Sequence, residues 1–190
     1  MTGIVLAGGG NTRMGQDKAF LTVGGRRLID RTVGVLRSLF REVIIVAADP
    51  FAHLDQDCAL VTDILPGTGA LGGLYTGLFT ASDDYAFVVA CDIPFLNRPF
   101  IEYMTSLAAG YDIVVPAPPD GLQPLHAVYS RRCLPVIRSL LVKGRRQIKE
   151  LYPSQRLLRI EPEVLNSFDP GGAMFLNINT PEDLRNLPPD

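Results

Sequence analysis

A short apolar run near the N-terminus ends abruptly in glycines. Residues 3–7 (Gly-Ile-Val-Leu-Ala) have the length and composition of a buried strand, and residues 8–10 are all glycine. Successive glycines let the backbone approach a ligand closely and present its amide groups, which suits a phosphate. Arg13 and Lys18 add two cations to the same loop. The chain is therefore expected to begin with a strand and a phosphate-binding loop.

Similar apolar runs recur along the chain and alternate with segments of helical periodicity. We expect strands at 3–7, 43–46, 59–62, 85–91, 111–115, 125–129 and 157–160, and helices at 28–40, 73–81, 99–108, 134–141 and from 181 onward. This alternation predicts an α/β fold with a doubly wound, mostly parallel sheet and helices on both faces. Ligands of such sheets bind beyond the carboxyl ends of the strands, so the loops after the first, third and fourth strands are the candidates for chemistry.

Length and charge limit the class of protein. A chain of 190 residues with 47% hydrophobic residues predicts one domain, 1–190, that buries a core without disulfides or metals. A net charge of −2 without a long basic run argues against nucleic-acid binding. No apolar run reaches the roughly 18 to 20 residues of a membrane span, and no secretory signal is evident. Three distant cysteines indicate reduced thiols. We expect a cytoplasmic protein.

Two carboxylates follow expected strands. Asp92 comes directly after the apolar run 85–91, and Asp63 follows the run 59–62. A buried carboxylate is costly unless it is compensated, and a Mg²⁺ ion shared with phosphates would compensate Asp92. Asp63 could accept hydrogen bonds from a base or a ribose. Asn177 and Asn179 are two residues apart and would face one side of an extended segment.

Two glycine patterns need separate interpretation. Residues 67–72 (Gly-Thr-Gly-Ala-Leu-Gly) match the dinucleotide-binding pattern of dehydrogenases but follow the third expected strand. We therefore favour a tight turn in which small residues let the next helix pack closely on the sheet. Residues 10–15 have the spacing of a P-loop, but Gln16 and Asp17 replace its Lys and Ser/Thr. The two histidines lie far apart, so no transition-metal site is predicted.

Four motifs in order resemble one family. They are Leu6-Ala-Gly-Gly with Arg13-Met-Gly-Gln-Asp-Lys-Ala-Phe-Leu, then Gly69-Ala-Leu-Gly-Gly-Leu, Cys91-Asp-Ile-Pro-Phe-Leu, and Asn177-Ile-Asn-Thr-Pro-Glu-Asp-Leu. Over residues 3–187 the chain is similar to the molybdenum cofactor guanylyltransferases, the MobA family of the nucleotidyltransferase superfamily. The resemblance implies a Rossmann-like nucleotidyltransferase fold, with a nucleotide-binding half (1–110) and an acceptor-binding half (111–190).

The resemblance also implies an activity: Mg²⁺-dependent transfer of GMP from GTP to molybdopterin, with release of pyrophosphate. GTP would be bound by Leu6, Ala7, Gly8, Gly9, Lys18, Asp63 and Asp92. Arg13, Lys18 and Asp92 would be catalytic, and Asp92 would ligate the metal. Gln123, His126, Asn177 and Asn179 are weaker candidates for the acceptor. Proteins that insert molybdenum and chaperones of molybdoenzymes are candidate partners.

Several alternatives stay open. A cytidylyltransferase acting on the same cofactor would share these loops, and a sugar-phosphate nucleotidyltransferase would share the first of them. A domain that only binds nucleotides would need neither Asp92 nor Lys18. Many family members have an Asn that contacts the nucleotide just after the second strand, whereas this chain has Ala47-Ala48-Asp49 there and lacks that Asn.

Overall fold

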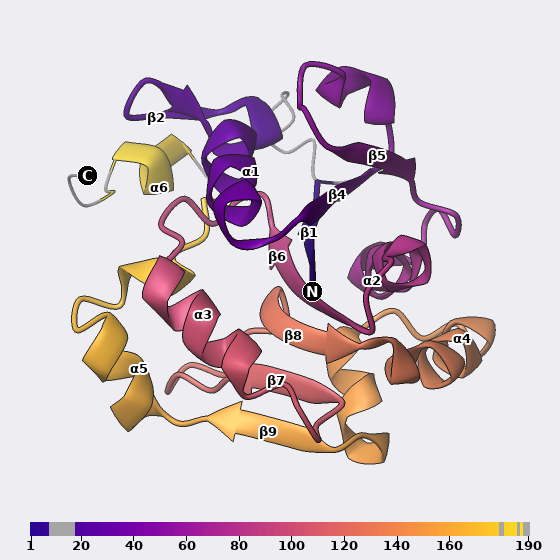
Figure 1. The fold of residues 1–190 in the computed structure, drawn as a ribbon. Coiled ribbons are helices and arrows are strands. Elements are labelled where there is room, and N and C mark those ends of the chain that lie inside the picture. Colours follow the sequence, from indigo (N-terminus) through magenta and orange to yellow (C-terminus); the bar gives the residue numbers. More distant parts are fainter. Residues whose placement is uncertain (8–17, 179–180, 186, 188–190) are drawn as a thin grey trace.

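The computed structural model describes residues 1–7, 18–178, 181–185 and 187 (Figure 1). The central sheet contains β1 (Thr2–Leu6), β4 (Glu42–Ala47), β5 (Ala59–Thr62), β6 (Tyr85–Ala90), β7 (Ile113–Pro116), β8 (His126–Ser130) and β9 (Leu157–Ile160). A hairpin is formed by β2 (Thr22–Val23) and β3 (Arg26–Arg27). The α-helices are α1 (Leu28–Leu39), α2 (Gly69–Thr80), α3 (Arg98–Ser106), α4 (Leu134–Val142), α5 (Pro162–Phe168) and α6 (Pro181–Arg185). Short 3-10 helices are η2 (Lys18–Phe20), η3 (Pro50–His53), η4 (Arg131–Cys133), η5 (Ile148–Ser154) and η6 (Ala173–Phe175).

The sheet has seven strands in the order β5-β4-β1-β6-β8-β7-β9. Strand β8 is antiparallel to both of its neighbours, and every other pairing in this sheet is parallel. The chain builds outward from β1 through β4 and β5, and then returns through α2 to place β6 on the other side of β1. The predicted doubly wound, mostly parallel α/β fold is confirmed, with its topological switch point between β1 and β6.

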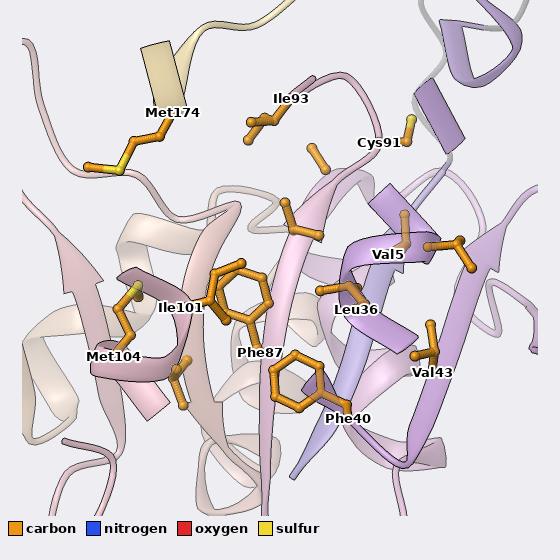
Figure 2. Close-up of a cluster of buried hydrophobic side chains, with 14 of the residues drawn as sticks. Val5, Leu36, Phe40, Val43, Phe87, Cys91, Ile93, Ile101, Met104 and Met174 are labelled. Carbon is orange, nitrogen blue, oxygen red and sulfur yellow. The ribbon is translucent and has the colours of Figure 1, made fainter. Parts of the chain in front are cut away.

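Helices cover both faces of the sheet (Figure 1). On one face Val5 packs toward α1, α3 and α5; on the other, Ile4 and Leu6 pack toward α2, α4 and η5. Figure 2 shows the first of these clusters, in which Leu36 of α1 and Met104 of α3 lie on the same face of the sheet. This alternation along β1 is the period-2 pattern of a strand buried on both faces.

Helix α2 begins within the second glycine-rich segment. The expected loop 67–73 is shorter than predicted, because the helix starts at Gly69 after a turn with positive φ at Gly67 (77°). An added Cβ at Gly73 would lie 3.4 Å from Leu6, and one at Gly77 would lie 2.8 Å from Ile4. These two glycines, which follow the motif, bring α2 close to β1. Within the motif, the positive φ of Gly67 and the clash that a Cβ at Gly72 would make with Thr68 Oγ1 agree with a tight turn.

The β2–β3 hairpin, α5 and the short 3-10 helices were not predicted from the sequence. The hairpin β2–β3 turns at Gly24 and Gly25, whose φ angles of 56° and 77° fit a type I′ turn. Its two-residue strands are too short to show alternation, although the Gly-Gly pair signals the turn. Helix α5 has seven residues and starts at Pro162, so it offers less than two turns of helical periodicity.

Candidate active site

Strands β1 and β6 end side by side at the switch point of the sheet. The Cys91 amide donates to the Leu6 carbonyl (3.2 Å), and the Ala7 amide donates to the Val46 carbonyl (2.9 Å). The carbonyl of Leu6 and the amide of Ala7 therefore fix the end of β1. A ligand contact at these two residues would use their other atoms.

Lys18 and Asp92 meet at this edge. Lys18 Nζ lies 3.6 Å from Asp92 Oδ2, and the two side chains are 15% and 21% exposed. Asp92 follows β6, whereas Lys18 begins η2, which is anchored by the fully buried Ala19. Burial raises the pKa of the Asp92 carboxyl above its usual value, and the nearby Lys18 ammonium opposes that rise. The structure thus brings together two residues that the sequence identified as catalytic.

The Asp92 site fits a metal that is shared with a ligand. Magnesium usually takes one or two protein carboxylates and completes its shell with water and phosphate oxygens. In the described ranges no group of three or more His, Cys, Asp and Glu side chains is arranged to hold a metal by itself. A single, partly exposed carboxylate beside a lysine suits an ion that arrives with a nucleotide.

Asp63 lies at the end of β5, and one of its oxygens is already engaged. Its Oδ1 accepts from the Leu65 amide (3.0 Å) and from the Thr76 hydroxyl (2.9 Å). Thr76 is fully buried on α2 and was missed by the sequence reasoning, although a threonine on the sheet-facing side of a helix is a signal for such a contact. Asp63 Oδ2 has no hydrogen-bond partner within the described residues, so it can face a ligand.

The C-terminal segment also reaches the site. The Ile178 amide donates to the Asp92 carbonyl (3.0 Å), and the neighbouring Asn177 is exposed. Gln123 precedes β8 on a loop at the same edge, where its amide donates to the Pro116 carbonyl (3.0 Å). Both remain candidates for the acceptor side.

His126 is placed differently from the expectation. Its ring is fully buried among Phe87, Phe100 and Phe175, with centroid distances of 5.2, 5.9 and 5.3 Å. Burial lowers the pKa of His126 to about 3, so the ring is neutral at physiological pH. Because the ring has no exposed surface, it cannot contact the acceptor directly. The prediction for His126 is therefore wrong, and the residue belongs to the core.

Four predicted site residues lie outside the described residues. They are Gly8, Gly9 and Arg13 in the first glycine-rich loop, and Asn179 near the C-terminus. Their roles stay predictions.

The sequence and the fold can be compared with those of known proteins. A sequence model of the MobA-like NTP transferase domain matches residues 3–158. The chain belongs to this family. A molybdenum cofactor guanylyltransferase from Desulfosudis oleivorans is 41% identical to this MobA-like chain over 186 residues, which cover 97% of the chain and 92% of that protein. A probable molybdenum cofactor guanylyltransferase from Pelotomaculum thermopropionicum is 39% identical and covers 96% and 89% of the two chains.

Solved structures agree with this assignment. Molybdopterin-guanine dinucleotide biosynthesis protein A from Archaeoglobus fulgidus matches with a TM-score of 0.84 at 26% identity, over 97% of this chain and 95% of that one. The 4-diphosphocytidyl-2C-methyl-D-erythritol synthase from Anaerococcus prevotii matches with a TM-score of 0.74 at 13% identity, over 97% and 94% of the two chains, which shows a shared fold alone. The predicted family and the Rossmann-like nucleotidyltransferase fold are confirmed, and this MobA-like chain is a nucleotidyltransferase. Within the described residues no helix is long and apolar enough to span a membrane.

Proposed function

We propose that the protein transfers GMP from GTP to molybdopterin, releases pyrophosphate and forms the guanine dinucleotide form of the molybdenum cofactor. The observation that carries this proposal is the Lys18–Asp92 pair at the switch point of a MobA-like domain. Relatives at 32–41% identity bear the name molybdenum cofactor guanylyltransferase and are covered over nearly their full length, which supports the choice of substrates.

The reaction asks little of acid–base side chains. The attacking group would be a phosphate monoester, which is already ionised at neutral pH, so no general base is required. Catalysis then consists of aligning two anions and stabilising the charge that develops. The chain agrees with this, because neither His53 nor His126 is exposed and neither has a hydrogen-bond partner among the described residues.

Each site residue has a defined task in this proposal. Lys18 would hold the phosphates of GTP by charge, and Arg13 would assist from the glycine-rich loop. Asp63, with one oxygen fixed by Thr76, would orient the nucleoside. Asp92 would hold Mg²⁺, which when bound would neutralise phosphate charge. Asn177 and Gln123 would face the acceptor.

Thermal unfolding in the presence of ligands tests which nucleotide the protein binds. GTP with Mg²⁺ at 100 times its Kd should stabilise the protein by about 2.7 kcal/mol, which raises the Tm by roughly 5 to 10 °C. CTP, UTP, ATP and NAD should have little effect, and EDTA should reduce the shift. A transfer assay with GTP and molybdopterin then tests the reaction.

The other outcomes assign other functions. A shift with CTP alone would support a cytidylyltransferase that acts on the same cofactor. A shift with NAD that is insensitive to EDTA would contradict the nucleotidyl site. GTP binding without transfer to molybdopterin, but with transfer to a sugar phosphate, would move the protein to the sugar-phosphate branch. The cytoplasmic location and the molybdenum-insertion and chaperone partners stay predictions.

A further inference from the structure

A cavity of about 730 Å³ is lined in part by the loop that follows Asp92. One wall is formed by the β2–β3 hairpin and α1, and the other by the loop before α3 and the segment after α5. Pro94 in this wall is two residues from Asp92, so their Cα atoms are at most about 7 Å apart. In Figure 2, Ile93 and the cavity residue Met174 lie together beyond the carboxyl end of β6. The cavity therefore adjoins the reaction site.

A pair of side chains where the two walls meet suits a flat ligand. The Arg31 guanidinium lies 5.8 Å from the centroid of the Phe95 ring, and its Nη1 donates to the Val23 carbonyl (3.3 Å). A planar cation held against an aromatic ring offers a surface on which a heterocycle can stack. Arg26 adds an exposed guanidinium that has no ion-pair partner among the described residues. This guanidinium favours a ligand that carries negative charge.

The segment after α5 offers a fixed hydrogen-bond acceptor. Asp169 Oδ2 accepts from the Met174 amide (2.6 Å), which holds the carboxylate in place, whereas Oδ1 has no hydrogen-bond partner within the described residues. A carboxylate oxygen matches the amino and ring N–H donors at the edge of a nitrogen heterocycle. Asn97 is rigid beside it, because it accepts from the Phe100 amide and donates to the Phe168 carbonyl, both at 2.9 Å.

We propose that this cavity binds the heterocyclic end of the acceptor, with Asp169 on its donor edge, Arg31 on its face and Arg26 on its anionic groups. The acceptor phosphate would then point toward Lys18 and Asp92. This inference rests on the proposed function, because it assigns the acceptor subsite of that reaction. The cavity volume lies within the roughly 300–1,000 Å³ of small-molecule sites and leaves room for a fused heterocycle.

Two cavity variants and one matched control test the proposal. Arg26→Met removes a charge at an exposed position, and Asp169→Asn keeps an acceptor for the Met174 amide while removing the carboxylate charge. Arg138→Met makes the same change as Arg26→Met at an exposed arginine of α4, outside the cavity lining. Each variant is assayed for GTP affinity by thermal shift and for the KM of molybdopterin in the transfer assay.

Both cavity variants should raise the KM for molybdopterin about tenfold, the effect of losing one charge-assisted contact, while GTP affinity stays at the wild-type value. Arg138→Met should change neither. An unchanged KM in both cavity variants, or an equal loss of GTP affinity, would overturn the inference.

A phosphate-free probe separates this inference from the proposed function. If the wild-type protein binds GTP but does not transfer GMP to molybdopterin, the proposed function has failed. Binding of 6-hydroxymethylpterin, measured by the fluorescence of the pterin, then tests the cavity proposal independently of the transfer reaction. Binding that is weakened in Asp169→Asn and retained in Arg26→Met and Arg138→Met supports a heterocycle site, because the probe lacks the anionic groups assigned to Arg26. No binding to the wild-type protein overturns it.

Discussion

The ionised carboxyl of Asp92 lowers the stability of the folded protein. It is 21% exposed and 3.6 Å from Lys18, yet burial still raises the pKa of its carboxyl. A carboxyl whose pKa is higher in the folded state than in the unfolded state favours folding when protonated, and this contribution is lost as the pH rises through the folded-state pKa. The ionised group therefore weakens the fold at neutral pH, which is consistent with the metal-binding role proposed for it.

Replacing Asp92 should separate activity from stability. Asp92→Asn is expected to lower the rate of GMP transfer by at least about 100-fold, because the charged group that would hold Mg²⁺ is lost. Its Tm at pH 7 should equal or slightly exceed that of the wild type, and the two values should converge under acid conditions as the wild-type carboxyl protonates. Near-normal turnover, or a Tm several degrees lower at pH 7, would contradict the assignment.

Lys18 should act on phosphates and not on the nucleoside. Lys18→Ala is expected to weaken GTP binding about tenfold or more, because a charge-assisted contact is lost, while guanosine binding changes little. Lys149→Ala removes the same charge from an exposed position on η5 and serves as the control. Calorimetric titration with GTP and guanosine measures both affinities. Equal losses for the two ligands would rule out the phosphate role.

At the scale of elements, sequence periodicity identified the strands and helices that are long and buried. The continuous apolar runs of β4 and β6 and the repeat along α1 were recognisable because each extends over several residues of one pattern. The β2–β3 hairpin and α5 were missed because they are too short to show a period. The start of α2 at Gly69 was also missed, since glycine is a poor helix former. Its positive φ (68°) explains why a glycine stands at this position.

The contact between α2 and β1 predicts opposite effects for two similar substitutions. Gly77→Ala would place a Cβ 2.8 Å from Cγ2 of the fully buried Ile4, so overpacking should cost about 1 to 3 kcal/mol. Gly34→Ala on α1 meets no atom within 4 Å and should stabilise the protein by about 0.5 to 1 kcal/mol. Urea denaturation measures both changes, and a Gly77→Ala protein as stable as the wild type would refute the close packing.

At the scale of the whole molecule, the sequence predicted the position of those candidate site residues that lie near the ends of strands. Lys18 and Asp92 follow from the positions of strands and glycines in a doubly wound sheet. His126 could not be placed in this way, because its face depends on the register of β8, in which it pairs with Val89 and turns toward the α1-side core. The cavity beside the site is lined by residues as distant in the sequence as Arg26 and Asp169, so no local motif reveals it.

The end of the sheet opposite the site should govern stability without affecting catalysis. Asp112 precedes β7, and its carboxylate accepts from Arg132 Nε (2.7 Å) and from the Arg156 amide (3.0 Å) and Nε (3.2 Å), which ties the starts of β7 and β9 to the end of β8. Because β7 runs parallel to β9, and β8 is antiparallel to both β6 and β7, Asp112 lies at the edge away from Asp92. The hydrogen bonds from the two arginines hold the pKa of Asp112 well below its usual value.

Asp112→Asn is therefore expected to lower the Tm at pH 7 by about 3 °C, or about 1 kcal/mol in a chain of this size, with the KM for GTP unchanged. A depressed folded-state pKa stabilises the protein above the unfolded value and loses that effect as the pH falls, so the difference in Tm should narrow below about pH 4. Asp57→Asn is the control, because Asp57 also pairs with an arginine, Arg37, but is 86% exposed and should contribute almost nothing. Thermal unfolding of both variants between pH 3 and pH 7 measures the effect; a constant gap across this range would show that charge is not what Asp112 contributes.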